Sequence, residues 1–94
     1  MEEINLDKFH KLVDLGAEII DVREKSEYQD ENINESKHWP LSSLNIRKRE
    51  ISQNTPSIFY CRSGLRSFQA AEIADSWTKQ KVYSLKGGIL KYKK

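Results

Sequence analysis

The pattern of apolar and polar residues predicts short strands that alternate with short helices. Runs rich in β-branched and aromatic residues are typical of buried strands, and apolar residues spaced by three and four are typical of helices. Strands are expected at 17–22, 58–60 and 81–85, with an extended piece at 37–39. Helices are expected between Asn5 and Gly16, at 26–30, from Ser42 or Ser43, and from about Leu65. This alternation indicates an α/β fold, with a small, mainly parallel sheet of four to five strands covered by helices on both faces.

Length, charge and cysteine content narrow the class of protein. A chain of 94 residues has room for one domain, which we expect to span residues 1–94. The net charge of +2 argues against a dedicated nucleic-acid binder. No apolar stretch approaches the roughly 20 residues of a membrane span, and the acidic start does not resemble a signal peptide. One cysteine cannot form an internal disulfide, which suits a reducing compartment, so we expect a cytoplasmic protein.

The lone cysteine, Cys61, lies where an expected strand gives way to an expected helix. The first N–H groups of a helix lack internal partners and carry a partial positive charge, so this position favours anions. Gly64 can adopt backbone angles that turn several N–H groups inward, and Arg62 and Arg66 add two positive charges. Cys61 could be an ordinary core residue. The combination instead favours a functional loop that stabilises the thiolate, which is the nucleophilic form.

The segment from Cys61 to Ser67 resembles the active-site loop of single-domain rhodaneses, sulfurtransferases with the pattern Cys-x-x-Gly-x-Arg-Ser/Thr. Similarity to the family extends to Asp21-Val22-Arg23, Glu27-Tyr28, Pro40-Leu41 and Gly87-Gly88. The resemblance implies a rhodanese-like fold and a catalytic Cys61. It also implies that the donor is bound by the rest of the loop, namely Arg62, Ser63, Gly64, Leu65, Arg66 and Ser67.

Two segments differ from the family pattern. The family usually has Gly-His-Ile-x-Gly-Ala where this chain has residues 31–36, and only Ile33 matches. Asn32 and Asn34 tolerate the positive φ that glycine supplies, so we expect a turn to persist there. Few residues follow Gly88, so the closing helix usual in the family is expected to be shortened or absent.

Asp21 and Arg23 come at the end of another expected strand. Because the carboxyl ends of parallel strands meet at one edge, these residues could support the pocket, but a structural ion pair is the favoured interpretation. No metal site is expected, since His10 and His38 stand apart and there is no second cysteine. No cofactor is expected either, other than a covalent persulfide on Cys61.

The resemblance implies that Cys61 takes sulfur from an anionic donor such as thiosulfate and passes it to cyanide or to a thiol, which could belong to a protein. A carrier or redox-responsive interaction module remains an alternative, in which Arg47–Arg49 would dock an acidic partner. A cysteine-dependent phosphatase is less favoured. Those enzymes have Cys-x5-Arg, whereas Arg66 comes one position early, and the shorter loop suits one sulfur atom better than a phosphoryl group.

Overall fold

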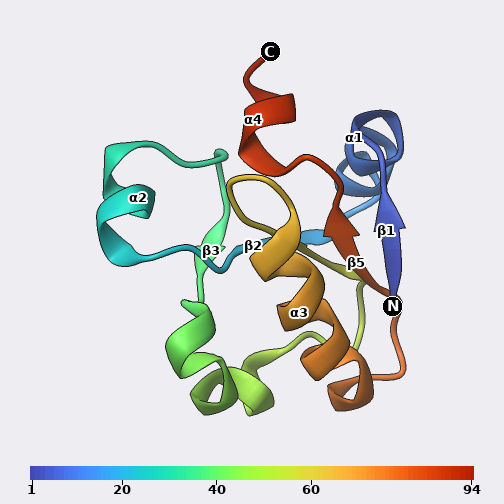
Figure 1. Cartoon of the computed structure of the whole chain (residues 1–94). Coiled ribbons are helices and arrows are strands. Elements are labelled where there is room, and N and C mark those ends of the chain that lie inside the picture. The colour runs from blue at the N-terminus through green and yellow to red at the C-terminus, as the bar shows by residue number, and fades with distance from the viewer.

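The computed structural model describes all 94 residues and contains one sheet of five strands (Figure 1). The strands are β1 (Glu2–Ile4), β2 (Glu18–Asp21), β3 (Lys37–His38), β4 (Ser57–Tyr60) and β5 (Val82–Leu85). Their order is β1-β5-β4-β2-β3, and every neighbouring pair is parallel. The expected α/β fold with a parallel sheet is confirmed.

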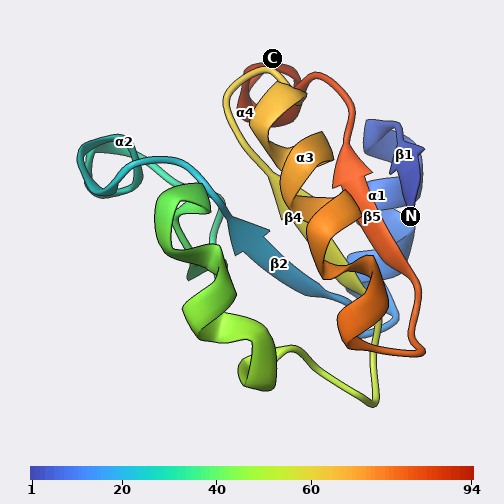
Figure 2. The ribbon, with the colours of Figure 1, turned by 60° about the horizontal axis from the view of Figure 1, so that its bottom comes forward.

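Helices cover both faces of this sheet (Figure 2). The α-helices are α1 (Leu6–Asp14), α2 (Lys25–Asp30), α3 (Leu65–Ala74) and α4 (Gly88–Tyr92), and the 3-10 helices are η1 (Leu41–Glu50) and η2 (Asp75–Trp77). Helices α3 and η1 lie over one face, and α1 lies over the other. None of these helices is long and apolar enough to cross a membrane.

The central strand β4 is buried on both sides, which explains its continuous apolar sequence. Ile58 and Tyr60 belong to the core that also contains Phe9 of α1, whereas Phe59 faces the core under α3. All three side chains have no exposed surface. β4 is held between two neighbouring strands and two helical layers. The end of this strand is therefore fixed in place, and Cys61 follows directly after it.

Two elements differ from the sequence-based expectation. Strand β1 was not expected, because it has only three residues, of which two are exposed, and it lies at the sheet edge. The helix expected from Ser42 or Ser43 is the 3-10 helix η1, which begins at Leu41 and is interrupted by non-helical angles at Ser43. Ile46 is 78% exposed. The apolar residues of this segment therefore do not share one buried face, as they would in the expected α-helix.

The turn that was expected within 31–36 is present at Asn34 and Glu35, closed by a hydrogen bond from the Ser36 N–H to the Ile33 carbonyl. The residue with positive φ is Glu35, at 67°, rather than either asparagine. Asn32 instead donates a side-chain hydrogen bond to the Tyr28 carbonyl. The closing helix is present but short, since α4 has five residues.

Candidate active site

The Cys61 side chain lies within the loop that joins β4 to α3. Its Sγ accepts backbone N–H groups from Gly64, at 3.1 Å, and from Ser67, at 3.3 Å. Cys61 is 1% exposed. Two N–H groups from the start of a helix therefore converge on one buried sulfur atom, and such groups stabilise a negative charge.

A buried hydroxyl pair lies behind this sulfur. The Cys61 thiol donates to Ser67 Oγ at 3.5 Å, and Ser67 Oγ lies 2.8 Å from Ser84 Oγ on β5. Both serines have no exposed surface. Ser67 Oγ donates to the Gly64 carbonyl at 3.2 Å. A hydroxyl has one proton and can rotate, so Ser67 would have to give up this bond in order to donate to the sulfur.

Two glycines allow the loop and α4 to approach each other closely. Gly64 has φ of 108° at the start of α3, and Gly88 has φ of 57° at the start of α4. A Cβ on Gly88 would overlap the carbonyl oxygens of Cys61 and Arg62. Those two carbonyls accept N–H groups of α4, from Ile89 at 2.9 Å and from Leu90 at 3.2 Å. The first turn of α4 therefore holds the loop backbone from one side.

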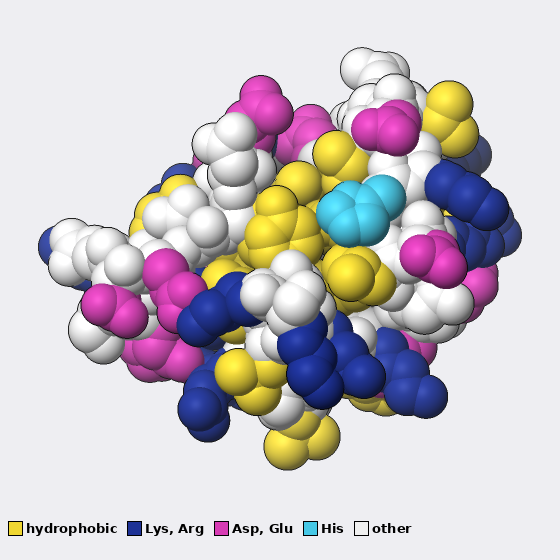
Figure 3. Space-filling model, turned by 90° about the horizontal axis from the view of Figure 1, so that it is seen from above, with side chains coloured by type: hydrophobic (Ala, Val, Ile, Leu, Met, Phe, Trp, Pro, Cys, Tyr) yellow, Lys and Arg dark blue, Asp and Glu magenta, His cyan; other side chains and the backbone are white.

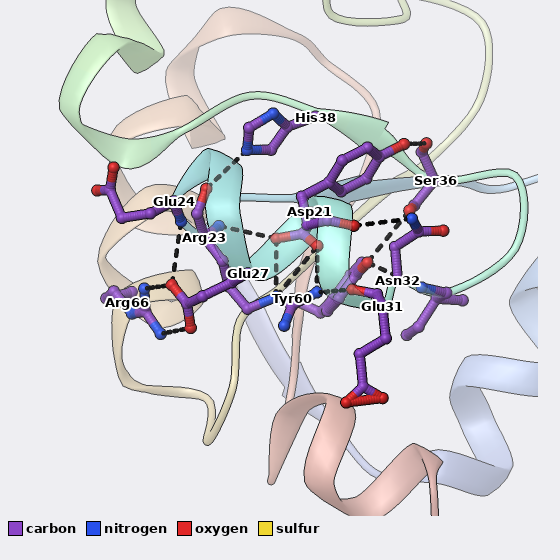
Figure 4. Close-up of polar contacts among 12 residues, drawn as sticks. Asp21, Arg23, Glu24, Glu27, Glu31, Asn32, Ser36, His38, Tyr60 and Arg66 are labelled. Carbon is purple, nitrogen blue, oxygen red and sulfur yellow. Dashed lines mark hydrogen bonds and ion pairs between the residues drawn. The ribbon is translucent and has the colours of Figure 1, made fainter.

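Arg66 is engaged by a carboxylate rather than left free at the loop (Figure 4). Its guanidinium donates to both oxygens of Glu27 on α2, at 2.8 and 3.1 Å. The hydrogen bond from Arg66 is the main reason that the pKa of Glu27 falls to about 2. The same bond, with a smaller contribution from the charge of Cys61, raises the pKa of Arg66. Arg66 thus ties the start of α3 to α2 while its charge stays near the sulfur.

Arg62 makes no ion pair and is exposed beside the thiol. It borders a hollow of about 270 Å³ that Glu27, Glu31 and Lys93 also line. Of the two loop arginines, Arg62 is therefore the one whose guanidinium is not already bonded to a carboxylate.

Asp21 and Arg23 form the ion pair that was expected at the end of β2. Arg23 Nη2 lies 2.8 Å from Asp21 Oδ2, and the two side chains are 4% and 0% exposed. Burial is the largest single influence on the pKa of Arg23 and lowers it, but the hydrogen bonds and charge of Asp21, together with those of Tyr60, raise it overall. Arg23 Nη2 also donates to the Glu31 carbonyl at 2.7 Å. The pair fixes the segment after β2 and does not contact Cys61.

Tyr60 completes this buried polar cluster. Its hydroxyl accepts the N–H of Ile33 at 3.0 Å and lies 3.1 Å from Ser36 Oγ. Burial is the main reason that its pKa rises to about 12. Nearby, His38 stacks on Tyr28 with ring centroids 4.5 Å apart, and its Nε2 lies 2.7 Å from the Arg23 carbonyl oxygen. No group of three or more His, Cys, Asp or Glu side chains is placed to hold a metal ion.

The structure thus brings together Cys61, Gly64 and Ser67 and leaves other predicted site residues at the surface. Ser63 and Leu65 are exposed beside the loop. Two residues that contact site residues were not among those predicted for the site. Glu27, which binds Arg66, was expected only as part of the family motif. Ser84, which lies beside Ser67, could not be predicted, because a serine in a strand can have many roles.

Comparisons with known proteins agree on one family. Residues 5–94 match the family model for the rhodanese-like domain. The chain is 38% identical over 76 residues to the uncharacterized protein YqhL of Bacillus subtilis, covering 81% of this chain and 60% of YqhL. It is 29% identical over 75 residues to the thiosulfate sulfurtransferase GlpE of Coxiella burnetii, covering 80% of this chain and 70% of GlpE. The structure of a rhodanese-related protein from Thermoplasma volcanium superposes with a TM-score of 0.84 at 24% identity, covering 95% of this chain and 87% of that one.

Proposed function

Because this chain belongs to the family of rhodanese-like domains, we propose that it is a sulfurtransferase that carries sulfur as a persulfide on Cys61. The observation that supports this most strongly is the set of donors around one buried sulfur. The N–H groups of Gly64 and Ser67 point at Cys61 Sγ, with the Ser67 hydroxyl beside them, and no carboxylate has been found in contact with it. Convergent N–H donors of this kind stabilise negative charge on the atom that they surround, and a thiolate is the attacking species.

We propose thiosulfate as the donor. The Cys61 thiolate attacks the outer sulfur of thiosulfate and forms the Sγ–S bond. The bond between the two sulfurs of thiosulfate breaks, its electron pair leaves with sulfite, and the persulfide keeps one negative charge. No proton, oxidant or reductant is needed. The thiosulfate activity in the name of the related GlpE supports this choice of donor.

The two loop arginines are assigned different roles. Arg62 is exposed and has no carboxylate partner, so it is the cation that we assign to the sulfonate oxygens of the donor. Arg66 is a positioning residue, because its guanidinium is held by Glu27. Its charge near Cys61 still offsets part of the negative charge that builds up in the loop.

The acceptor is a thiophilic group from outside the chain, because Cys61 is the only cysteine. A cyanide ion or an acceptor thiolate attacks the outer sulfur, and the bond to Sγ breaks with its electron pair returning to Cys61. The enzyme then alternates between a free and a sulfur-loaded form, which implies ping-pong kinetics.

Steady-state transfer from thiosulfate to cyanide, measured by thiocyanate formation, tests the proposal. We expect parallel double-reciprocal lines for the wild type and no turnover for Cys61→Ser. Turnover that survives in Cys61→Ser, or no turnover in a folded wild type, would contradict the proposed activity. Absence of turnover together with stable sulfur loading would instead favour the carrier alternative. Cysteine-dependent hydrolysis of an aryl phosphate would support the phosphatase alternative.

A further inference from the structure

A groove of about 460 Å³ borders the Cys61 loop on the side of β5 and α4. Part of the loop itself lines it, including Gly64, whose N–H binds Cys61 Sγ. The remaining wall belongs to the start of α3, to the segment that joins β5 to α4, to α4 itself and to β1. The lining residues are Glu3, Ser63, Gly64, Leu65, Phe68, Lys86, Gly87 and Lys91. Since Cys61 is 1% exposed, a protein that reaches its sulfur must contact the surface around this loop.

Exposed apolar side chains line one side of the groove. Leu65 is 72% exposed and Phe68 is 36% exposed. They are three positions apart on α3, so they lie on the same side of the helix. Single exposed apolar residues are common, but two that share one face beside a reactive group offer contact area to a partner.

The groove also carries an excess of positive charge. Lys86 and Lys91 are exposed, and neither takes part in any ion pair of the chain. Glu3 is the only acidic residue among those that line the groove. Figure 3 shows this end of the molecule, where Lys and Arg side chains gather together with hydrophobic ones and the acidic side chains lie mainly toward the margins.

The second hollow beside the loop has a different charge. Its lining is balanced in charge, because the carboxylates of Glu27, Asp30 and Glu31 stand against the cations of Arg23, Arg62 and Lys93. Two of these cations, Arg23 and Lys93, are already held in ion pairs. In the groove, by contrast, an acidic segment would meet two unpaired lysines and a single carboxylate, Glu3. Charge complementarity therefore assigns an acidic occupant to the groove.

The basic run that the sequence offered as a docking site lies elsewhere. Arg47–Arg49 form the end of η1, and Figures 1 and 2 both show that end at the opposite extreme of the molecule from the Cys61 loop. A peptide segment bound only at that end of η1 would not contact the Cys61 loop.

We propose that the groove docks an acidic protein segment that carries the cysteine receiving the sulfur, an inference that rests on the proposed sulfurtransferase function. The apolar side chains of the segment pack on Leu65 and Phe68, and its carboxylates face Lys86 and Lys91. Its thiolate attacks the outer sulfur of the Cys61 persulfide. One S–S bond forms on the acceptor, the bond to Cys61 Sγ breaks, and the acceptor leaves as a persulfide while Cys61 returns to a thiolate.

The test measures discharge of the preloaded persulfide by defined thiols. The protein is loaded with thiosulfate, desalted and mixed at low ionic strength with a short peptide that has one cysteine among Glu and Leu residues. A peptide with Lys in place of Glu and the small thiol 2-mercaptoethanol serve as comparisons, and intact mass follows the loss of sulfur. We expect the acidic peptide to discharge Cys61 about tenfold faster than the lysine peptide, and we expect added salt to reduce this ratio.

Variants of surface residues test where on the protein the acidic peptide binds. Lys86→Glu combined with Lys91→Glu should remove or reverse the preference for the acidic peptide and leave discharge by 2-mercaptoethanol unchanged. The matched control, Lys48→Glu with Arg49→Glu, changes the net charge equally at the far end of η1 and should keep the preference. Phe68→Ser should slow both peptides. Equal rates for the two peptides, or equal loss of preference in both double variants, would overturn the groove assignment. Failure of the protein to load sulfur at all would instead overturn the proposed function.

Discussion

The carboxyl ends of two neighbouring strands, β4 and β2, both carry buried ionisable side chains but surround them differently. β2 and β4 pair in parallel, so Cys61 and the Asp21–Arg23 pair come from the same edge of the sheet. At the end of β2, Asp21 receives three side-chain hydrogen bonds from Arg23, and the cluster has a partner for each charge. At the end of β4, two backbone N–H groups and a hydroxyl surround Cys61 Sγ with no basic or acidic side chain bonded to it.

This difference separates a structural cluster from a chemical one. Buried charges that satisfy each other stabilise one arrangement of the chain and have no capacity left for a ligand. Donors that converge on one ionisable atom stabilise its charged form and leave that atom to react. The first cluster should therefore be sensitive in stability and the second in activity.

The largest expected effect on stability lies in the β2 cluster. Asp21→Asn leaves the buried Arg23 charge without its counter-charge, so we expect the free energy of unfolding to fall by about 3 to 5 kcal/mol. Chemical denaturation measures this loss. Sulfur transfer per folded molecule should remain close to that of the wild type. A stable Asp21→Asn protein with little activity would contradict a purely structural role for this ion pair, because Asp21 would then take part in the chemistry.

A substitution under the thiol loop should affect both properties. In Gly88→Ala the new methyl group overlaps the carbonyls of Cys61 and Arg62, so the loop or α4 must move. We expect a loss of about 1 to 3 kcal/mol in unfolding free energy, together with a clear fall in the rate of sulfur loading.

Gly16→Ala is the matched control for Gly88→Ala. Gly16 also has positive φ, at 100°, but no atom lies within 4 Å of the added Cβ. Its variant should lose stability and keep the loading rate of the folded protein. If both variants load sulfur equally well, close contact between α4 and the loop is not needed for the chemistry.

The two loop arginines differ in the same way, since Arg66 is bonded to a carboxylate and Arg62 is not. Arg62→Gln removes the cation that we assign to the donor, and a hydrogen bond to a charged group contributes about 1.5 to 3 kcal/mol. We expect kcat/KM for thiosulfate to fall about tenfold or more in Arg62→Gln and to fall less in Arg62→Lys, which keeps the positive charge. Arg66→Gln should change kcat/KM less than Arg62→Gln. The reverse order would show that Arg66 leaves Glu27 and binds the donor.

The smallest expected effect is on stability and comes from the ion pair between Arg66 on α3 and Glu27 on α2. The pKa of Glu27 is lowered from 4.5 to about 2, so the pair stabilises the fold fully above about pH 4.5 and loses this contribution as the pH falls toward 2. Both side chains are partly exposed, so Glu27→Gln should cost only about 0.2 to 1 kcal/mol near neutral pH.

Denaturation of the wild type and Glu27→Gln across this pH range measures the difference between them. We expect that difference to shrink as the pH falls. Asp30→Asn, an exposed substitution on the same helix, should show no such trend. A difference that stays constant with pH would contradict the assignment of the pair.

Local sequence was enough to predict the part of the site that local structure builds. A buried strand, a cysteine, a glycine and a helix start within a few residues of one another determine where Cys61 and its N–H donors lie. The ion pair of Asp21 with Arg23 could be predicted for the same reason, since the two residues are close along the chain.

Contacts between distant segments could not be predicted in this way. Glu27 and Arg66 are 39 positions apart, and either loop arginine could have been the one that it binds. Ser84 reaches Ser67 only because β5 runs beside β4, which no local pattern specifies. The edge strand β1 and the 3-10 helix η1 were missed or misassigned because short and exposed elements leave little apolar pattern.

Whether Cys61 itself takes up sulfur is read from the intact mass of the protein after incubation with thiosulfate. We expect a gain of one sulfur atom in the wild type, which dithiothreitol removes, and no gain in Cys61→Ser. No gain in a folded wild type, or the same gain in Cys61→Ser, would contradict sulfur uptake by Cys61.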